Sequence, residues 1–286
     1  MSEDITKFDK IEECEIKMKY KGILGAIIGD IVGSRFEWNN RKSKDFEFLT
    51  NECFYTDDSV LTVAIGQALL ECNKNYAYLS EKTISKLHEF GTLYPDAGYG
   101  GSFCRWLLTK STNPYNSWGN GAAMRVSACA YFANSLDEAK DLSHKVTCVT
   151  HNHPEGLKGA EATTVATYMA LHGSTKEEIR QYILDNYYNI DFTIDSIREY
   201  YDFDVSCQGS VPQALQAFFE SKSYEDAIRN AISIGGDSDT IAAITGAVAC
   251  AYYGIPDDIK EKASSYLNCH LQTVVNNIDN KIRDKF

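Results

Sequence analysis

An apolar helical run near the C-terminal end, residues 241–253, constrains the fold of this 286-residue chain more than any other feature. Small residues recur along one side of it at helical spacing, namely Ala243, Gly246, Ala247 and Cys250. A helix face built from small side chains lets neighbouring helices approach closely, so the run predicts a central, buried helix. An acidic stretch, Asp237-Ser238-Asp239-Thr240, stands at the N-terminus of this helix.

A second acidic stretch, Thr56-Asp57-Asp58-Ser59, opens another apolar helical run, residues 60–70. Either stretch alone is explained by helix capping, because helix starts favour Asp, Ser and Thr. Capping does not require two carboxylates and a threonine in both places. Four carboxylates brought together would raise one another's pKa values unless cations lay between them. Together the stretches predict an oxygen-lined site for Mg²⁺ or Mn²⁺ rather than for zinc, which prefers His and Cys.

The remaining sequence predicts an all-α fold, because strand-like alternation is scarce and helix signals are frequent. Two capping-box patterns, Ser135 to Glu138 and Ser174 to Glu177, predict helices that run to about Val149 and Tyr188. Further helical periodicity covers residues 22–34, 80–93, 126–132, 156–171, 211–221, 225–234 and 263–282. We expect residues 1–20 to be a polar N-terminal extension, either a tail or an added helix, and residues 21–286 to form a single domain.

The charge balance limits the partners of the protein. A formal net charge of -12 argues against a nucleic-acid backbone or an anionic membrane as partner, but it allows an anionic small molecule held by metals or backbone amides. The nine cysteines are scattered without a CxxC pair, which is typical of reduced thiols in a cytoplasmic protein. No secretory signal or membrane-spanning run is evident, and we expect a monomer.

Two glycine-rich stretches are candidates for ligand contacts. Residues 95–103 interleave glycines with aromatics, which allows backbone amides to approach a phosphate while rings stack on a base or ribose. Residues 118–125 lead into a predicted helix, whose N-terminus could bind an anion. Both stretches are equally compatible with ordinary turns. His151 and His153 precede a helix without a zinc-binding pattern, and Glu37 alone reads as a solvated residue after a helix.

In content and order, these motifs resemble the ADP-ribosylglycohydrolase family over roughly residues 21–266. The motifs are Gly29-Asp30-x-x-Gly33-x-x-x-Glu37, Thr56-Asp57-Asp58-Ser59, Gly98-Tyr99-Gly100-Gly101, Asn120-Gly121-Ala122-Ala123-Met124-Arg125, His151-x-His153-Pro154 and Gly235-Gly236-Asp237-Ser238-Asp239-Thr240. The resemblance implies a compact all-α fold with two Mg²⁺ or Mn²⁺ ions at the bottom of a cleft. Ser59 stands where many members have threonine.

The resemblance also implies roles for individual residues. The implied metal ligands are Thr56, Asp57, Asp58, Asp237, Asp239 and Thr240. Glu37 matches the family's acidic residue on a mobile flap over the metals, and Glu37 and Asp96 are the catalytic candidates. The implied substrate-binding residues are Tyr99, Gly100, Gly101, Ser102, Phe103, Asn120, Gly121, Ala122, Met124 and His151.

The implied reaction is hydrolysis at the anomeric carbon of the distal ribose, which releases ADP-ribose from an arginine or serine side chain of a modified protein or from a related conjugate. The general base is Glu37, Asp96 or a metal-ligating aspartate. A dehalogenase-like phosphatase is excluded because only 46 residues follow Thr240, too few for its α/β core. An EF-hand fails for lack of a glutamate at the twelfth loop position. A catalytically silent ADP-ribose-binding member of the same fold remains the alternative.

Overall fold

The computed structural model describes residues 20–285, so the expected polar extension lies outside the described residues apart from Tyr20. The all-α prediction is confirmed, since these residues contain no β-strand and only two isolated bridges. The α-helices are α1 Leu24–Gly33, α2 Asp57–Cys72, α3 Leu79–Leu93, α4 Gly101–Leu108, α5 Ser127–Phe132, α6 Leu136–Thr147, α7 Pro154–Leu171, α8 Lys176–Asn186, α9 Ile194–Ile197, α10 Cys207–Glu220, α11 Tyr224–Ser233, α12 Ser238–Tyr253, α13 Asp257–Ser264 and α14 Cys269–Arg283. Three short 3₁₀ helices are η1 Ser34–Phe36, η2 Tyr76–Tyr78 and η3 Asn120–Ala122. No helix in this described part combines the length and the apolar character needed to cross a membrane.

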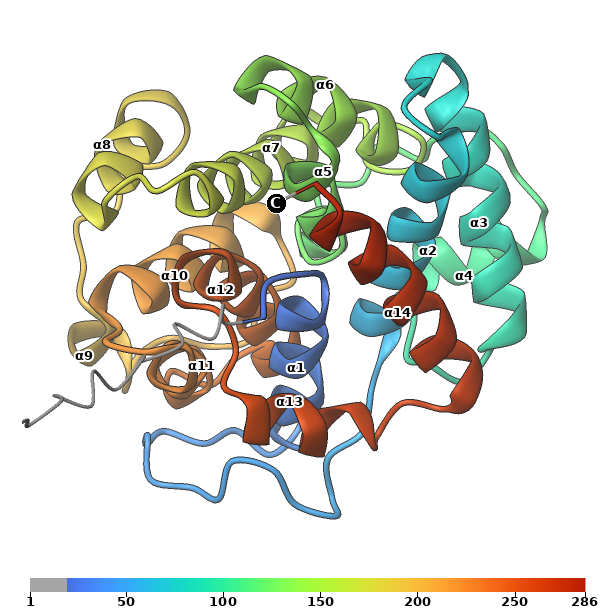
Figure 1. The fold of residues 1–286 in the computed structure, drawn as a ribbon. Helices are drawn as coiled ribbons and strands as arrows, with labels where there is room; N and C mark the ends of the chain where they lie inside the picture. Colours follow the sequence, from blue (N-terminus) through green and yellow to red (C-terminus); the bar gives the residue numbers. More distant parts are fainter. Residues whose placement is uncertain (1–19, 286) are drawn as a thin grey trace, which may run out of the picture.

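Helix α12 is the central helix that the small-residue pattern predicts. Its residues 238–251 are all buried, and it lies against α1 with α7, α10 and α11 around it (Figure 1). Glycines at every fourth position of α1 allow the close approach. A side chain at Gly29 would overlap the main chain at Ala242, and one at Gly33 would stand 2.5 Å from the Asp239 Cα. The start of α12 is therefore held at a fixed position in the interior.

Several helix boundaries differ from the sequence prediction, and two of these differences involve helix caps. The capping box of α8 uses Thr175 and Glu178, so the predicted box at Ser174 is wrong by one residue. The predicted helix over residues 263–282 is two helices, α13 and α14. Asn268 separates them because its side chain accepts a hydrogen bond from the Leu271 amide at 2.9 Å and so caps the start of α14.

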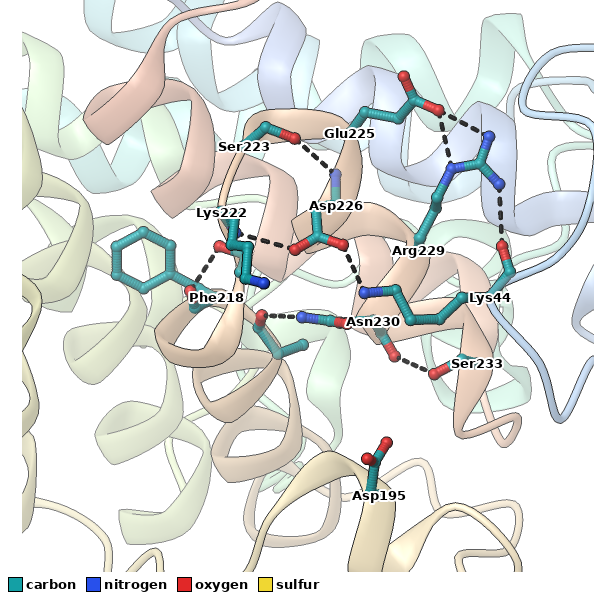
Figure 2. A network of polar contacts seen from close by, with 12 residues as sticks. Lys44, Asp195, Phe218, Lys222, Ser223, Glu225, Asp226, Arg229, Asn230 and Ser233 are labelled. Carbon is teal, nitrogen blue, oxygen red and sulfur yellow. Dashed lines mark hydrogen bonds and ion pairs between the residues drawn. The ribbon is translucent and has the colours of Figure 1, made fainter.

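The segment between η1 and α2, residues 37–56, lacks helix and is held against α11 by side chains (Figure 2). Arg229 donates to the main-chain oxygens of Lys44 at 3.0 Å and Phe46 at 2.7 Å, and the Lys44 ammonium pairs with Asp226. Nearer the start of the segment, the Asn40 side chain both accepts from the Gly236 amide and donates to the Gly236 oxygen. These contacts fix the segment that begins with Glu37.

Candidate active site

A cleft of about 480 Å³ opens beside the N-termini of α2, α4 and α12. One part of its wall is acidic, and the other part comes from the two glycine-rich stretches. The acidic part is made by Glu37, Asp57, Asp58, Asp237, Asp239 and Thr240. The other part includes Tyr99, Gly100, Gly101, Ser102, Phe103, Asn120, Gly121, Met124 and His151. The fold therefore gathers into one cleft most of the residues that the sequence singled out.

The two acidic stretches meet at the base of this cleft. The Thr240 hydroxyl donates a hydrogen bond to Asp58 Oδ2 at 3.1 Å, which joins the start of α12 to the start of α2. Carboxylate oxygens of Asp30, Asp58 and Asp239 lie within 4.8 Å of one another, and a second group within that distance adds Glu37 and Asp237 to Asp239. Asp239 is the member shared by both groups, so it lies at the centre of the cluster.

Asp30 also belongs to the cluster, although its sequence motif indicated no role for its side chain. Its carboxylate accepts hydrogen bonds from the Thr56 amide at 2.9 Å, the Thr56 hydroxyl at 2.7 Å and the Ser59 amide at 3.1 Å, and also from the Ser59 hydroxyl. Both carboxylate oxygens are thus occupied in shaping the turn that begins α2. The Gly29-Asp30 motif carried the signal for this residue, but its partners stand 26 and 29 positions further along the chain.

Three further candidates occupy different positions relative to the acidic cluster. Glu37 is half-buried and lines the cleft. Thr56 is buried behind the cluster, where its hydroxyl donates to Asp30 and accepts from the Asp58 amide as the N-cap of α2. Asp96 is exposed and is absent from the cleft lining, so the structure does not bring it to the acidic cluster.

Burial and mutual repulsion hold protons on these carboxylates. Burial, followed by the charges of Asp30 and Asp237, raises the pKa of Asp57 to about 8. Burial and then the charges of Asp237 and Asp30 raise the pKa of Glu37 to about 7. The pKa values of Asp58 and Asp239 are well above the usual aspartate range for the same reasons. A cation bound here would replace those protons.

The cluster also fits a hard cation by its donor set. All its candidate ligand atoms are oxygens, which Mg²⁺ and Mn²⁺ prefer. Asp58 Oδ1 is buried and has no hydrogen-bond partner among residues 20–285. A buried carboxylate oxygen left without a donor is costly, and a bound cation would remove that cost.

The raised pKa values predict how the stability of the metal-free protein depends on pH. Between the unfolded pKa values near 4 and the folded values near 6 to 8, the folded state binds more protons than the unfolded state. The free energy of unfolding should therefore fall as pH rises, by up to about 1.4 kcal/mol per pH unit for each extra proton. Thermal melts in EDTA from about pH 5.5 to about pH 8.5 measure this. Saturating Mg²⁺ should abolish most of the fall, whereas a melting temperature that rises with pH in EDTA would contradict the electrostatic account.

The first glycine-rich stretch is part loop and part helix. Residues 95–100 lack helix, whereas Gly101, Ser102 and Phe103 form the first turn of α4. A Cβ placed on Gly100 or Gly101 would meet nothing within 4 Å. The first turn of α4 therefore borders open space in the cleft wall, and the Tyr99 and Phe103 rings lie 5.1 Å apart beside it.

The second glycine-rich stretch reaches the acidic cluster directly. Asn120 Nδ2 donates to Asp237 Oδ2 at 2.7 Å and to the Ser210 hydroxyl at 3.0 Å. The predicted anion site at the following helix is not formed, because α5 starts at Ser127, which is buried and does not line the cleft. Ala122 is likewise fully buried and away from the cleft wall.

His151 and His153 have different surroundings. His153 caps α7, since its ring accepts from the Glu155 amide at 3.1 Å. His151 is 6% exposed and lines the cleft opposite Gly119 and Gly121.

A methyl group at Gly121 is expected to weaken ligand binding without unfolding the protein. Its Cβ would stand 3.6 Å from His151 Nε2 and meet no closer atom, so the fold tolerates it, but it would occupy the cleft beside the ring. We expect Gly121→Ala to weaken ADP-ribose binding by about tenfold or more, measured by calorimetry, with an unchanged melting temperature. The matched control is Ala77→Ser, which also adds one heavy atom but at an exposed position outside the cleft. Equal affinity of Gly121→Ala and wild type would place the ligand elsewhere.

The structure is thus an all-helical fold whose buried helix starts collect carboxylates at the base of one cleft. The sequence model of the ADP-ribosylglycohydrolase family matches residues 16–284, so the chain belongs to this family and is an enzyme that hydrolyses glycosidic bonds. The identification made from the motif order is thereby confirmed.

Individual relatives agree with this assignment. The chain is 26% identical to ADP-ribosylhydrolase ARH3 of Mus musculus, over 83% of this chain and 84% of the mouse protein. It is 24% identical to ADP-ribosylarginine hydrolase Tri1 of Pseudomonas putida (strain GB-1), over 82% of this chain and 70% of that protein. A solved structure described as an ADP-ribosylglycohydrolase-related protein complex has a TM-score of 0.65 at 20% identity, covering 90% of this chain and 95% of that one. This last similarity supports the fold.

Proposed function

We propose that the protein is a hydrolase dependent on divalent cations that releases ADP-ribose from ADP-ribosylated protein side chains. The observation that carries this proposal is the meeting of carboxylates from α2, α12 and the Glu37 segment at the base of a cleft whose other wall is glycine-rich. Family membership supports ADP-ribose as the bound group. The names of the relatives support an ADP-ribosyl linkage as the bond that is cut.

We assign two Mg²⁺ ions, or Mn²⁺ in their place, to the cluster. The ligands would be Thr56, Asp57, Asp58, Asp237, Asp239 and Thr240. When bound, the cations supply positive charge that polarises the ribose hydroxyls and lowers the pKa of an attacking water. Asp30 orients the first ligand stretch through its bonds to Thr56 and Ser59, and Asn120 orients Asp237.

Glu37 is the proposed general base. It lies in the cleft with an oxygen within 4.8 Å of both Asp237 and Asp239, so it stands where a water beside the ligands would be found. Its segment is anchored through Asn40, which holds the main chain close to the start of α12. Asp96 lacks such a position, because it is exposed outside the cleft. A metal-ligating aspartate is the remaining alternative.

The glycine-rich wall is the proposed site of the ADP part of the ligand. Gly101 and Ser102 begin α4 and line the cleft, so the positive N-terminal end of this helix lies in the cleft wall. A phosphate group suits such a position. The Tyr99 and Phe103 rings lie next to these amides and offer an apolar contact to adenosine. Ribose and diphosphate would thus span from α4 and His151 to the acidic cluster.

The leaving group is tested with defined substrates. Peptides carrying ADP-ribose on arginine or on serine are incubated with the protein, and free ADP-ribose is measured by chromatography. We expect release from at least one linkage. A protein that binds ADP-ribose in calorimetry but releases none from either peptide would be the silent binding member of the fold.

A further inference from the structure

Arg125 is the largest side chain that is almost completely buried, with 1% of its surface exposed. One guanidinium nitrogen donates to the Thr150 hydroxyl at 2.6 Å, while Nε has no partner among residues 20–285. No carboxylate of these residues lies within ion-pair distance of it, and the charge of Asp57 acts only from further away. Burying a guanidinium without a carboxylate costs free energy. The Thr150 hydroxyl is a neutral partner that offsets only part of this cost, and the Arg125 side chain also borders the cleft.

The contacts of Arg125 decide which nitrogen of His151 carries the proton. His151 Nδ1 lies 2.8 Å from the Thr150 hydroxyl and 3.4 Å from the guanidinium. A guanidinium can only donate, so its N–H group at 3.4 Å can bond to Nδ1 only if Nδ1 carries no proton, and the Thr150 hydroxyl can then donate to the same nitrogen. Nδ1 therefore accepts, and the neutral ring carries its hydrogen on Nε2.

The ring is held neutral by its surroundings. Burial, followed by the neighbouring guanidinium, keeps the pKa of His151 well below its usual value. Tyr115 is the other titratable group against the ring, with centroids 5.7 Å apart, and burial raises the pKa of its phenol. Neither the Arg125 guanidinium nor the Tyr115 phenol can accept a proton from Nε2 near neutral pH.

The Nε2 side of His151 faces the cleft. The positions that a Cβ would take on Gly119 and Gly121 lie 3.7 and 3.6 Å from Nε2, so glycine leaves the space beside this nitrogen open. Nε2 has no hydrogen-bond partner within residues 20–285. The His151 Nε2–H group therefore faces the cleft as a hydrogen-bond donor, and the positively charged Arg125 guanidinium lies near Nδ1 of the same ring. This arrangement suits an anionic oxygen as the acceptor.

We propose that Arg125 is a positioning residue which, together with Thr150, holds His151 as an Nε2–H donor to the diphosphate of the bound ADP-ribose. This proposal rests on the proposed function for the identity of the ligand. It goes beyond that function in two ways: the buried Arg125 guanidinium fixes the His151 tautomer, and it supplies positive charge to the ligand site of an acidic protein.

The test uses the full-length protein and the variants Thr150→Val and Arg125→Gln. Thr150→Val removes the hydroxyl that donates to Nδ1, and Arg125→Gln removes the charge. ADP-ribose affinity is measured by calorimetry, the His151 tautomer by ¹⁵N-resolved NMR with His151→Gln as the assignment control, and kcat and KM with the peptide that the wild type cleaves. Thr164→Val is the matched control, because its hydroxyl is also buried but has no hydrogen-bond partner in the described chain.

We expect wild-type His151 to show an unprotonated Nδ1 and a protonated Nε2. Thr150→Val and Arg125→Gln should weaken ADP-ribose binding by about tenfold or more and raise KM correspondingly, with kcat reduced only a few fold. Thr164→Val should match the wild type. If Arg125→Gln does not fold, Thr150→Val decides.

An Nδ1–H tautomer in the wild type, or unchanged ADP-ribose affinity in folded Thr150→Val, would overturn the proposal. Both readouts are independent of turnover. A wild-type protein that binds ADP-ribose but cleaves no peptide would count against the proposed function. The tautomer and the ADP-ribose affinity would still test the role of Arg125.

Discussion

Asp239→Asn is expected to reduce the release of ADP-ribose by more than about 100-fold, the largest effect of any single substitution. Loss of a residue that merely orients a metal ligand typically costs about 10- to 100-fold, so loss of a ligand should cost more. Asp239 is the carboxylate common to both oxygen groups of the cluster. The amide oxygen of asparagine can still accept from the Thr240 amide, which bonds Asp239 Oδ1 at 2.9 Å, so the helix start should survive.

The same variant should melt no earlier than the wild type in EDTA, since it removes one member of a repelling cluster. Circular dichroism checks the helices, and turnover is measured at limiting and at saturating Mg²⁺. Asp279→Asn is the control: Asp279 is also a buried acid, but it accepts from the Ile23 amide at 3.1 Å away from the cleft. Near-normal turnover of Asp239→Asn at limiting Mg²⁺ would show that this residue is not a ligand.

Glu37→Gln should lower kcat by roughly 10²-fold, the usual scale for a lost general acid or base, while ADP-ribose affinity stays within a few fold. Glutamine keeps the size of the side chain but cannot take a proton from water. The measurement is single-turnover hydrolysis of an ADP-ribosylated peptide, paired with calorimetric titration of ADP-ribose.

Glu52→Gln provides the comparison for Glu37, because Glu52 belongs to the same anchored segment but its side chain is 81% exposed. It should hydrolyse the peptide at the wild-type rate. An unaltered rate in Glu37→Gln would return Glu37 to a surface role and leave a metal-ligating aspartate as the base.

The features that the sequence predicted well are those with a local cause. Small residues at helical spacing identified α12 as the central helix, and two acidic stretches at helix starts indicated a common site. Each depends on residues close together in the chain, so periodicity and capping preferences were sufficient. The order of the motifs then added what no single motif could establish.

The features that the sequence missed depend on contacts between distant segments. Asp30 shapes the start of α2 through residues 26 and 29 positions away, and Arg125 fixes His151 across 26 positions. Neither contact leaves a periodic signal. The capping box of α8 was misplaced for a different reason: Ser174 with Glu177 and Thr175 with Glu178 both fit the pattern, and only the backbone hydrogen bonds decide between them.

Part of the cleft mouth was also unforeseen. Trp38 and Phe203 line the cleft and stack at 5.1 Å, although they are 165 positions apart and belong to segments without helix. Exposed aromatics in irregular segments have no sequence pattern that distinguishes a cleft wall from ordinary surface. The close approach of Gly236 to Tyr201 and Asp202 packs these distant segments together, and the sequence carries no sign of that contact.

The most direct test of the account is the single-turnover release of ADP-ribose by protein stripped with EDTA, followed while Mg²⁺ is added back. The account predicts no release from the stripped protein, recovery of the full rate with Mg²⁺ or Mn²⁺, and no recovery in Asp239→Asn. Release at the undiminished rate by the stripped wild-type protein would contradict the claim that the acidic cluster works by holding divalent cations.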